Sequence, residues 1–123
     1  MLGTHKIMAF VGTRDPERAK ALYRDVLGLR LVSEDGFAVV FDACGTMLRV
    51  TTAQKAAAAQ YTVLGWQAPD IAAAVRALQK TGVKFEYFEG MKQDELGIWT
   101  APGGARMAWL KDPDENILSL TQF

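Results

Sequence analysis

The chain has 123 residues, of which 50% are hydrophobic and 23% are charged, a composition typical of one folded domain and too apolar for a disordered segment. Fourteen basic residues balance fourteen acidic ones, so no basic surface indicates nucleic-acid binding. No apolar run approaches the roughly 20 residues that cross a membrane, and residues 1–10 do not resemble a signal peptide. We therefore expect a cytoplasmic protein without a nucleic-acid or membrane partner.

The first elements in chain order are a strand over residues 7–11 and a helix that begins after Asp15. The Asp15 carboxylate can cap this helix, and Pro16 suits its first position. Gly28 ends the helix as a left-handed cap. Between them lies an apolar stripe of helical period, formed by Ala19, Leu22, Tyr23, Val26 and Leu27. Three strands are then predicted over residues 30–33, 37–42 and 46–51. Asp35-Gly36 predicts a hairpin turn between the first two.

The same order of elements repeats 55 residues further on. A strand over residues 62–66 precedes a helix that Asp70 caps and Gly82 ends, with a stripe of Ile71, Ala74, Val75 and Leu78. The strands that follow are predicted over residues 84–88, 106–110 and 117–121, and residues 112–116 form a turn. Each half reads β-α-β-β-β. We predict an α+β fold in one domain, residues 1–123, with modules over about residues 5–51 and 61–123.

Two segments do not repeat. Residues 52–60 read TAQKAAAAQ, which favours a short connecting helix. Residues 89–104 are an insertion in the second half only, and such an excursion is usually a lid, a binding loop or a partner contact.

Two motifs carry a resemblance to a known family. Residues 15–28 read DPERAKALYRDVLG and residues 111–118 read KDPDENIL. Both resemble scaffold motifs of the vicinal oxygen chelate superfamily, which includes glyoxalase I, bleomycin-resistance proteins and extradiol dioxygenases. The resemblance implies a curved mixed sheet with a cup-shaped cavity and assembly as a homodimer. The family has glycine where this chain has Glu115, so we expect a positive φ at that residue.

The resemblance also implies four positions that hold a divalent metal in the family's enzymes. Counting from the helix caps and the motifs, these positions are Met8, Arg49, Val63 and Ser119. None is a usual ligand, and an arginine would repel a cation. We therefore predict no metal and no cofactor. The lone His5 lies three residues before Met8, on the opposite face by strand alternation, and Cys44 lies in a predicted turn; we interpret both as structural.

Strand alternation adds further candidate contacts. Phe10 shares a face with Met8, and Gly65 shares one with Val63. Trp99 of the insertion would close over them, and the wall would be completed by Val40 or Phe41 and by Met107 or Trp109. Arg49 has two interpretations: a solvated arginine or ion-pair partner across a dimer, and a clamp for an organic anion.

Two classes of function follow. The first is a module that binds a small organic molecule, anionic or aromatic, with Met8, Phe10, Arg49, Val63, Gly65, Trp99 and Ser119 as ligand contacts. The second is a lyase, isomerase or dioxygenase of the glyoxalase type, metal-independent or with atypical ligands, in which Tyr61, Asp94 or Glu95 would serve as acid or base. A dimeric domain with a vestigial cup is a third interpretation. We rank the binding module first.

Overall fold

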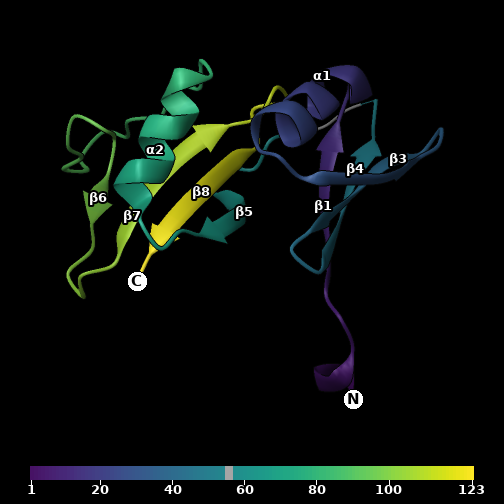
Figure 1. Cartoon of the computed structure of the whole chain (residues 1–123), viewed down its shortest axis with the longest axis horizontal. Coiled ribbons are helices and arrows are strands. Elements are labelled where there is room, and N and C mark those ends of the chain that lie inside the picture. The colour runs from purple at the N-terminus through teal and green to yellow at the C-terminus, as the bar shows by residue number, and fades with distance from the viewer. Residues whose placement is uncertain (55–56) are drawn as a thin grey trace. The chain divides into compact units, whose positions relative to one another are not determined.

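The computed structural model describes residues 1–54 and 57–123, which divide into two compact units, Met1–Ala57 and Ala58–Phe123. Each unit holds one four-stranded mixed sheet and one main helical segment (Figure 1). This arrangement confirms the α+β class and the tandem modules. Among the described residues, no helix has the length and apolar character needed to cross a membrane.

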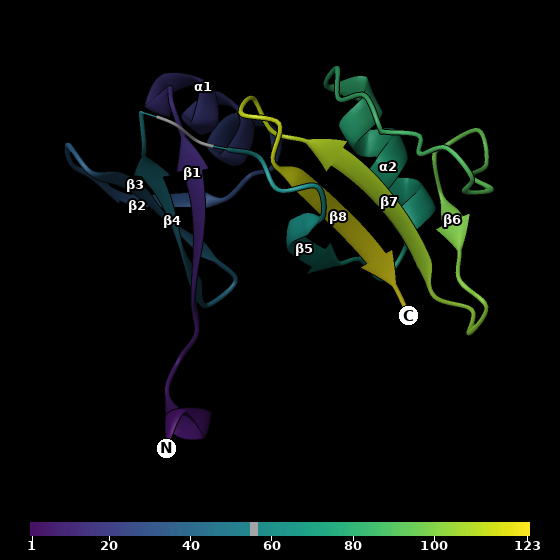
Figure 2. The same cartoon turned by 180° about the vertical axis from the view of Figure 1, so that it is seen from behind.

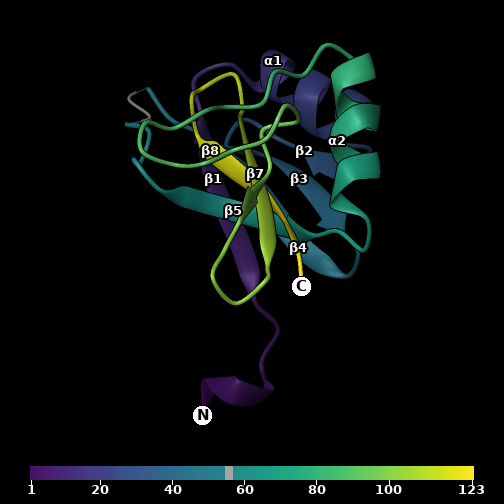
Figure 3. The same cartoon turned by 90° about the vertical axis from the view of Figure 1, so that its left-hand side faces the viewer.

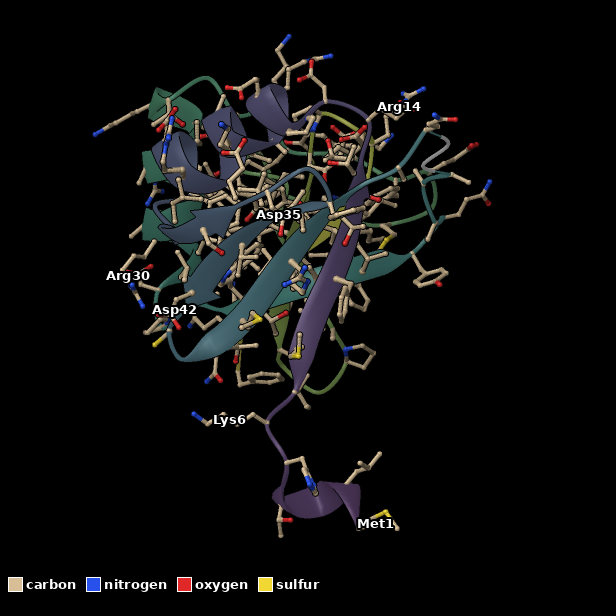
Figure 4. The ribbon with its side chains drawn as sticks, turned by 90° about the vertical axis from the view of Figure 1, so that its right-hand side faces the viewer. Met1, Lys6, Arg14, Arg30, Asp35 and Asp42 are labelled. Carbon is tan, nitrogen blue, oxygen red and sulfur yellow. The ribbon has the colours of Figure 1, made fainter. Side chains whose placement is uncertain are left out.

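The first unit consists of a short 3₁₀ turn, four strands and a helix. Its sheet has the order β1-β4-β3-β2, with β1 parallel to β4 and the other neighbours antiparallel. The 3₁₀ turn lies before β1, and residues 1–6 extend away from the sheet (Figure 4). The elements are η1 (Leu2–Thr4), β1 (Met8–Thr13), α1 (Pro16–Lys20), η2 (Ala21–Val26), β2 (Arg30–Glu34), β3 (Ala38–Ala43) and β4 (Thr46–Thr52).

The helix of the first unit begins as predicted and then changes type. The Asp15 side chain accepts hydrogen bonds from the backbone N–H groups of Glu17 and Arg18. From Ala21 to Val26 the predicted helical segment continues as a π-helix. The wider turn holds Tyr23, which is fully buried with its ring centroid 6.0 Å from that of Phe41.

The second unit repeats the plan with β5 (Thr62–Gln67), α2 (Ile71–Lys80), β6 (Trp99–Thr100), β7 (Arg106–Lys111) and β8 (Ile117–Gln122). Its sheet has the order β5-β8-β7-β6, and β7 lies beside β8 (Figure 2). The Asp70 carboxylate accepts from the N–H of Ala73, which confirms the predicted cap. Helix α2 packs against β7 and β8 through the fully buried Ile71 and Val75 (Figure 3).

The predicted strand over residues 84–88 is wrong. In its place the short strand β6, within the insertion, pairs with β7. Residues 84–88 make one backbone bond toward β7, from the N–H of Glu86 to the carbonyl of Trp109. The Gln93 side chain bonds the Glu86 carbonyl and the Phe88 N–H. These backbone groups therefore need no further strand as a partner.

Of three predicted connecting segments, one prediction is wrong and two are confirmed. The predicted connecting helix over residues 52–60 is wrong where it can be examined, because Thr52 ends β4 and residues 53–54 and 57–60 are not helical; Lys55 and Ala56 lie outside the described residues. The expected positive φ of Glu115 is confirmed at 66°. Cys44 lies in the predicted turn, between β3 and β4, and is exposed.

Candidate functional site

One face of the first sheet carries Arg49 among apolar side chains. Arg49 on β4 is the register partner of Phe10 on β1 and of Val40 on β3, and Met8 pairs with Met47 two residues earlier. Because neighbours in register share a face, these side chains lie together; we call Met8, Phe10, Val40, Met47 and Arg49 the Arg49 face. Met8 is 46% exposed and Phe10 is 59% exposed, although both are large and apolar.

The opposite face of the same sheet forms the core. Leu48 and Val50 flank Arg49 in sequence and are each 1% exposed. Phe41 belongs to this buried face, where its ring packs near that of Tyr23. Of the two residues expected beside Arg49, Val40 and not Phe41 lies on the same face as Arg49. The alternation of buried and partly exposed residues along β4 therefore places the guanidinium away from the core.

The carboxylates of Asp35 and Asp42 in the first unit are already engaged. Asp42 lies beside Arg30, with Oδ2 3.6 Å from Nη2 (Figure 4). The Asp35 carboxylate accepts from the backbone N–H groups of Phe37 at 2.7 Å and Ala38 at 3.0 Å. These two bonds, and then the attraction of Arg49, lower the pKa of Asp35. Within residues 1–54 and 57–123, the Arg49 guanidinium has no hydrogen-bonded or ion-paired acceptor.

The second sheet has a corresponding face. Ser119 on β8 is the register partner of Gly65 on β5 and of Trp109 on β7. Met107 lies two residues before Trp109 and pairs with Trp99 on β6. We call Gly65, Trp99, Met107, Trp109 and Ser119 the Ser119 face. Both Met107 and Trp109 belong to it, since they are two residues apart on one strand.

The two faces use equivalent register positions. Phe10 pairs with Arg49 in the first sheet as Gly65 pairs with Ser119 in the second, and Phe10 and Gly65 are separated by the predicted 55 residues. Val63 lies at a register irregularity between Thr62 and Leu64, and it is partly buried. A bulge of this kind changes the direction in which a side chain points. Strand alternation alone therefore does not predict the orientation of Val63.

Aromatic rings cluster around Trp109. Its ring centroid lies 5.5 Å from that of Phe88 in an edge-to-face arrangement and 6.2 Å from that of Trp99. Such pairs stabilise each other beyond the area that they bury. Trp99, the one ring of the three that the insertion contributes, is therefore packed against Trp109.

The insertion is held by polar side chains. The Gln93 amide donates to the carbonyls of Glu86 at 2.9 Å and Gly97 at 2.8 Å, and its oxygen accepts from the N–H of Phe88 at 2.8 Å. The Asp94 carboxylate accepts from the N–H groups of Leu96 and Ile98, each at 2.9 Å. Asp94, one of the predicted acid–base candidates, thus has a structural role here.

Two adjoining grooves lie at the Lys111 end of the Ser119 face. The larger, of about 420 Å³, is lined by Ala58, Ala59, Gln60, Phe88, Lys111, Glu115 and Ile117. The smaller, of about 210 Å³, is lined by Gln60, Tyr61, Thr62, Phe88, Met91, Trp109 and Ile117. The sequence reasoning missed Phe88, Lys111 and Ile117. Counting two residues from Trp109 and Ser119 would have placed Lys111 and Ile117 on this face.

The four residues that the family resemblance assigns to metal positions carry a thioether, a guanidinium, an aliphatic chain and a hydroxyl. Divalent cations prefer carboxylate or imidazole ligands in proteins. Among the described residues no three His, Cys, Asp or Glu side chains form a metal-binding group. His5 lies outside β1, with Nδ1 3.0 Å from the Met1 carbonyl oxygen.

One family model matches most of the chain. The family model "Glyoxalase/Bleomycin resistance protein/Dioxygenase superfamily" matches residues 5–120. No curated protein sequence matches the chain.

Solved structures share the fold at low sequence identity. A lactoylglutathione lyase from Agrobacterium tumefaciens has 19% identity over 96% of this chain and 93% of its own, with a TM-score of 0.74. A glyoxalase/bleomycin resistance protein/dioxygenase from Alicyclobacillus acidocaldarius has 17% identity over 98% and 92%, with a TM-score of 0.73. A glyoxalase family protein from Enterococcus faecalis has 16% identity over 98% and 99%, with a TM-score of 0.76.

Proposed function

We propose, from the premise that the chain belongs to the glyoxalase/bleomycin resistance protein/dioxygenase superfamily, that it binds a small organic anion without a metal. Arg49 is the charged contact, and Met8 and Phe10 are apolar contacts on the same face. On the second sheet, considered by itself, Val63, Gly65, Trp99 and Ser119 are the proposed contacts for a small organic ligand. The observation that carries the proposal is the guanidinium of Arg49, which lies among exposed apolar side chains without a bonded acceptor in the described residues.

The chemistry of this face supports an anion in particular. A guanidinium offers several N–H donors in a plane, which match the two oxygens of a carboxylate or phosphate. The Asp35 carboxylate, which Arg49 attracts, accepts from backbone N–H groups, and the Asp42 carboxylate lies beside Arg30. Burial of the exposed Met8 and Phe10 side chains against the apolar part of a ligand would make the binding free energy more favourable.

The test is a comparison of three proteins with one ligand. A thermal-shift screen of aromatic carboxylates and organic phosphates first selects an anion that stabilises the wild type. Its affinity is then measured for the wild type, Arg49→Lys and Arg49→Met. We expect Arg49→Met to weaken binding by about 2–4 kcal/mol, the scale for removing one partner of a buried charged pair, and Arg49→Lys to recover part of it. Equal affinity in wild type and Arg49→Met would overturn the proposal.

Absence of a metal is tested separately. We expect elemental analysis of the purified protein to find no stoichiometric divalent ion, because Met8, Arg49, Val63 and Ser119 provide no suitable ligand set. One tightly held ion per chain would contradict this part of the proposal.

We also propose that the chain forms a homodimer. β1 is an edge strand of its sheet and carries the exposed Met8 and Phe10, and exposed apolar side chains at a sheet edge favour association. Sedimentation equilibrium at micromolar concentration should show a dimer. A monomer alone would contradict the assembly without affecting the ligand proposal.

A further inference from the structure

The larger groove of the second unit has an unusual balance of charge. Among the described residues that line it, Lys111 and Glu115 carry charged side chains. Nζ of Lys111 lies 3.7 Å from Oε1 of Glu86, so the ammonium already has an acidic partner. Among the described residues, Glu115 has no ion pair and its side chain accepts no hydrogen bond. The carboxylate of Glu115 is therefore the uncompensated charge of the groove.

Glu115 also occupies a backbone position that suits it poorly. Its φ is 66°, in the left-handed region where a side chain with a Cβ costs free energy and glycine does not. Hydrogen bonds stabilise the rest of the turn, because the Asp112 carboxylate accepts from the N–H groups of Asp114 and Asn116, each at 2.9 Å. Backbone strain of this kind is often found at functional sites. The carboxylate thus lines the groove at a cost in stability.

The floor of the groove is apolar and aromatic. Phe88 and Ile117 line both grooves, and Trp109 lines the smaller one that adjoins. The faces of aromatic rings attract organic cations, and the attraction increases when the cation is partly removed from water. A carboxylate beside aromatic rings therefore has the chemistry to receive an ammonium group that is attached to an apolar body.

We propose that the two adjoining grooves together bind an aromatic amine in its protonated form, with Glu115 of the larger groove pairing the ammonium and Phe88 and Trp109 contacting the ring. The site lies at the Lys111 end of the second sheet, away from the Trp99–Met107 pair at the other end of the Ser119 face. It takes a ligand of opposite charge to that assigned to Arg49 in the first unit. The anion site at Arg49 and the amine site at Glu115 involve different residues, so an experiment can contradict one proposal without contradicting the other.

The test uses three probes that share one ring system: 2-naphthylmethylamine, 2-naphthylmethanol and 2-naphthoate. Each is titrated into the uniformly ¹⁵N-labelled protein, and amide shifts report both affinity and location. We expect the amine to bind more tightly than the alcohol and the acid, with the largest shifts at residues 58–62, Phe88 and Glu115. Tighter binding of the acid, or shifts confined to other parts of the chain, would overturn the proposal.

Variants separate charge from shape. Glu115→Gln keeps the side-chain length and the strained backbone, and we expect it to weaken the amine by roughly fivefold, the scale of a partly exposed ion pair. Lys111→Met removes a like charge and should leave the amine bound at least as tightly. Glu95→Gln is the matched control, since Glu95 is exposed on the insertion and lines neither groove. An unchanged affinity in Glu115→Gln, or a loss in Lys111→Met, would overturn the proposal.

Discussion

Gly65 and Ser119 are register partners on the parallel strands β5 and β8, and there is no room between them for another side chain. A Cβ built on Gly65 would lie 2.7 Å from Oγ of Ser119 and 3.4 Å from its carbonyl oxygen. The sequence predicts that a glycine inside a strand marks a bend or a space kept clear. The structure identifies the neighbour that occupies that space as the Ser119 hydroxyl.

This contact predicts that Gly65→Ala destabilises the protein by about 1 kcal/mol, because the new methyl group forces the hydroxyl to move. Ser119→Ala should be nearly neutral, and the double variant Gly65→Ala/Ser119→Ala should recover the loss. Urea denaturation of the four proteins gives the coupling free energy. If the changes in unfolding free energy of the two single variants simply add in the double variant, the new methyl group does not displace the hydroxyl, and the strands move apart instead.

The left-handed backbone of Glu115 predicts that Glu115→Gly stabilises the fold by about 1 kcal/mol, because glycine adopts φ near 66° without a steric cost. Glu115→Ala is the control, since it removes the carboxylate and keeps the Cβ that causes the strain. The measurement is the denaturant midpoint at unchanged m-value. A lower midpoint for Glu115→Gly than for the wild type would show that the turn is not strained.

The three hydrogen bonds of Gln93 predict that Gln93→Ala costs about 2–4 kcal/mol, because two carbonyls and one N–H of a partly buried segment lose their partner. Gln93→Glu has nearly the same shape but cannot donate to the carbonyls of Glu86 and Gly97. It should therefore be comparably destabilised. Lys92→Ala, at the exposed neighbouring position, should be neutral. The midpoint of thermal denaturation is measured for each variant. An unchanged midpoint for Gln93→Ala would show that residues 84–98 keep their conformation without this side chain.

The Asp35 carboxylate predicts a pH dependence of stability. Hydrogen bonds from Phe37 and Ala38 lower its folded-state pKa below the ordinary aspartate value of about 3.9. Its stabilising contribution is therefore complete above that value and is lost as the pH falls through the folded-state pKa. Asp35→Asn should be less stable than the wild type at neutral pH, and the difference should narrow in acid. A difference that does not change with pH would show that the charge of Asp35 contributes nothing.

The sequence by itself determined the elements whose signals are local. Asp15, Pro16 and Gly28 delimit the first helical segment, and Asp70 and Gly82 delimit the second, because a cap needs only the few residues next to it. Alternation along β4 placed Arg49 opposite Leu48 and Val50 for the same reason. The left-handed turn at Glu115 followed from a motif, and motifs of this kind specify the backbone locally.

Only the tertiary structure decided which segments pair and which side chains surround each candidate residue. Residues 84–88 have a strand-like sequence, but the Gln93 side chain bonds their backbone, and β6 pairs with β7 instead. The bulge at Val63, the π-helix from Ala21 and the row of Phe88, Trp109 and Trp99 depend equally on partners distant in the chain. Such contacts are selected by the packing of whole elements, and the periodicity of a single segment carries no information about them.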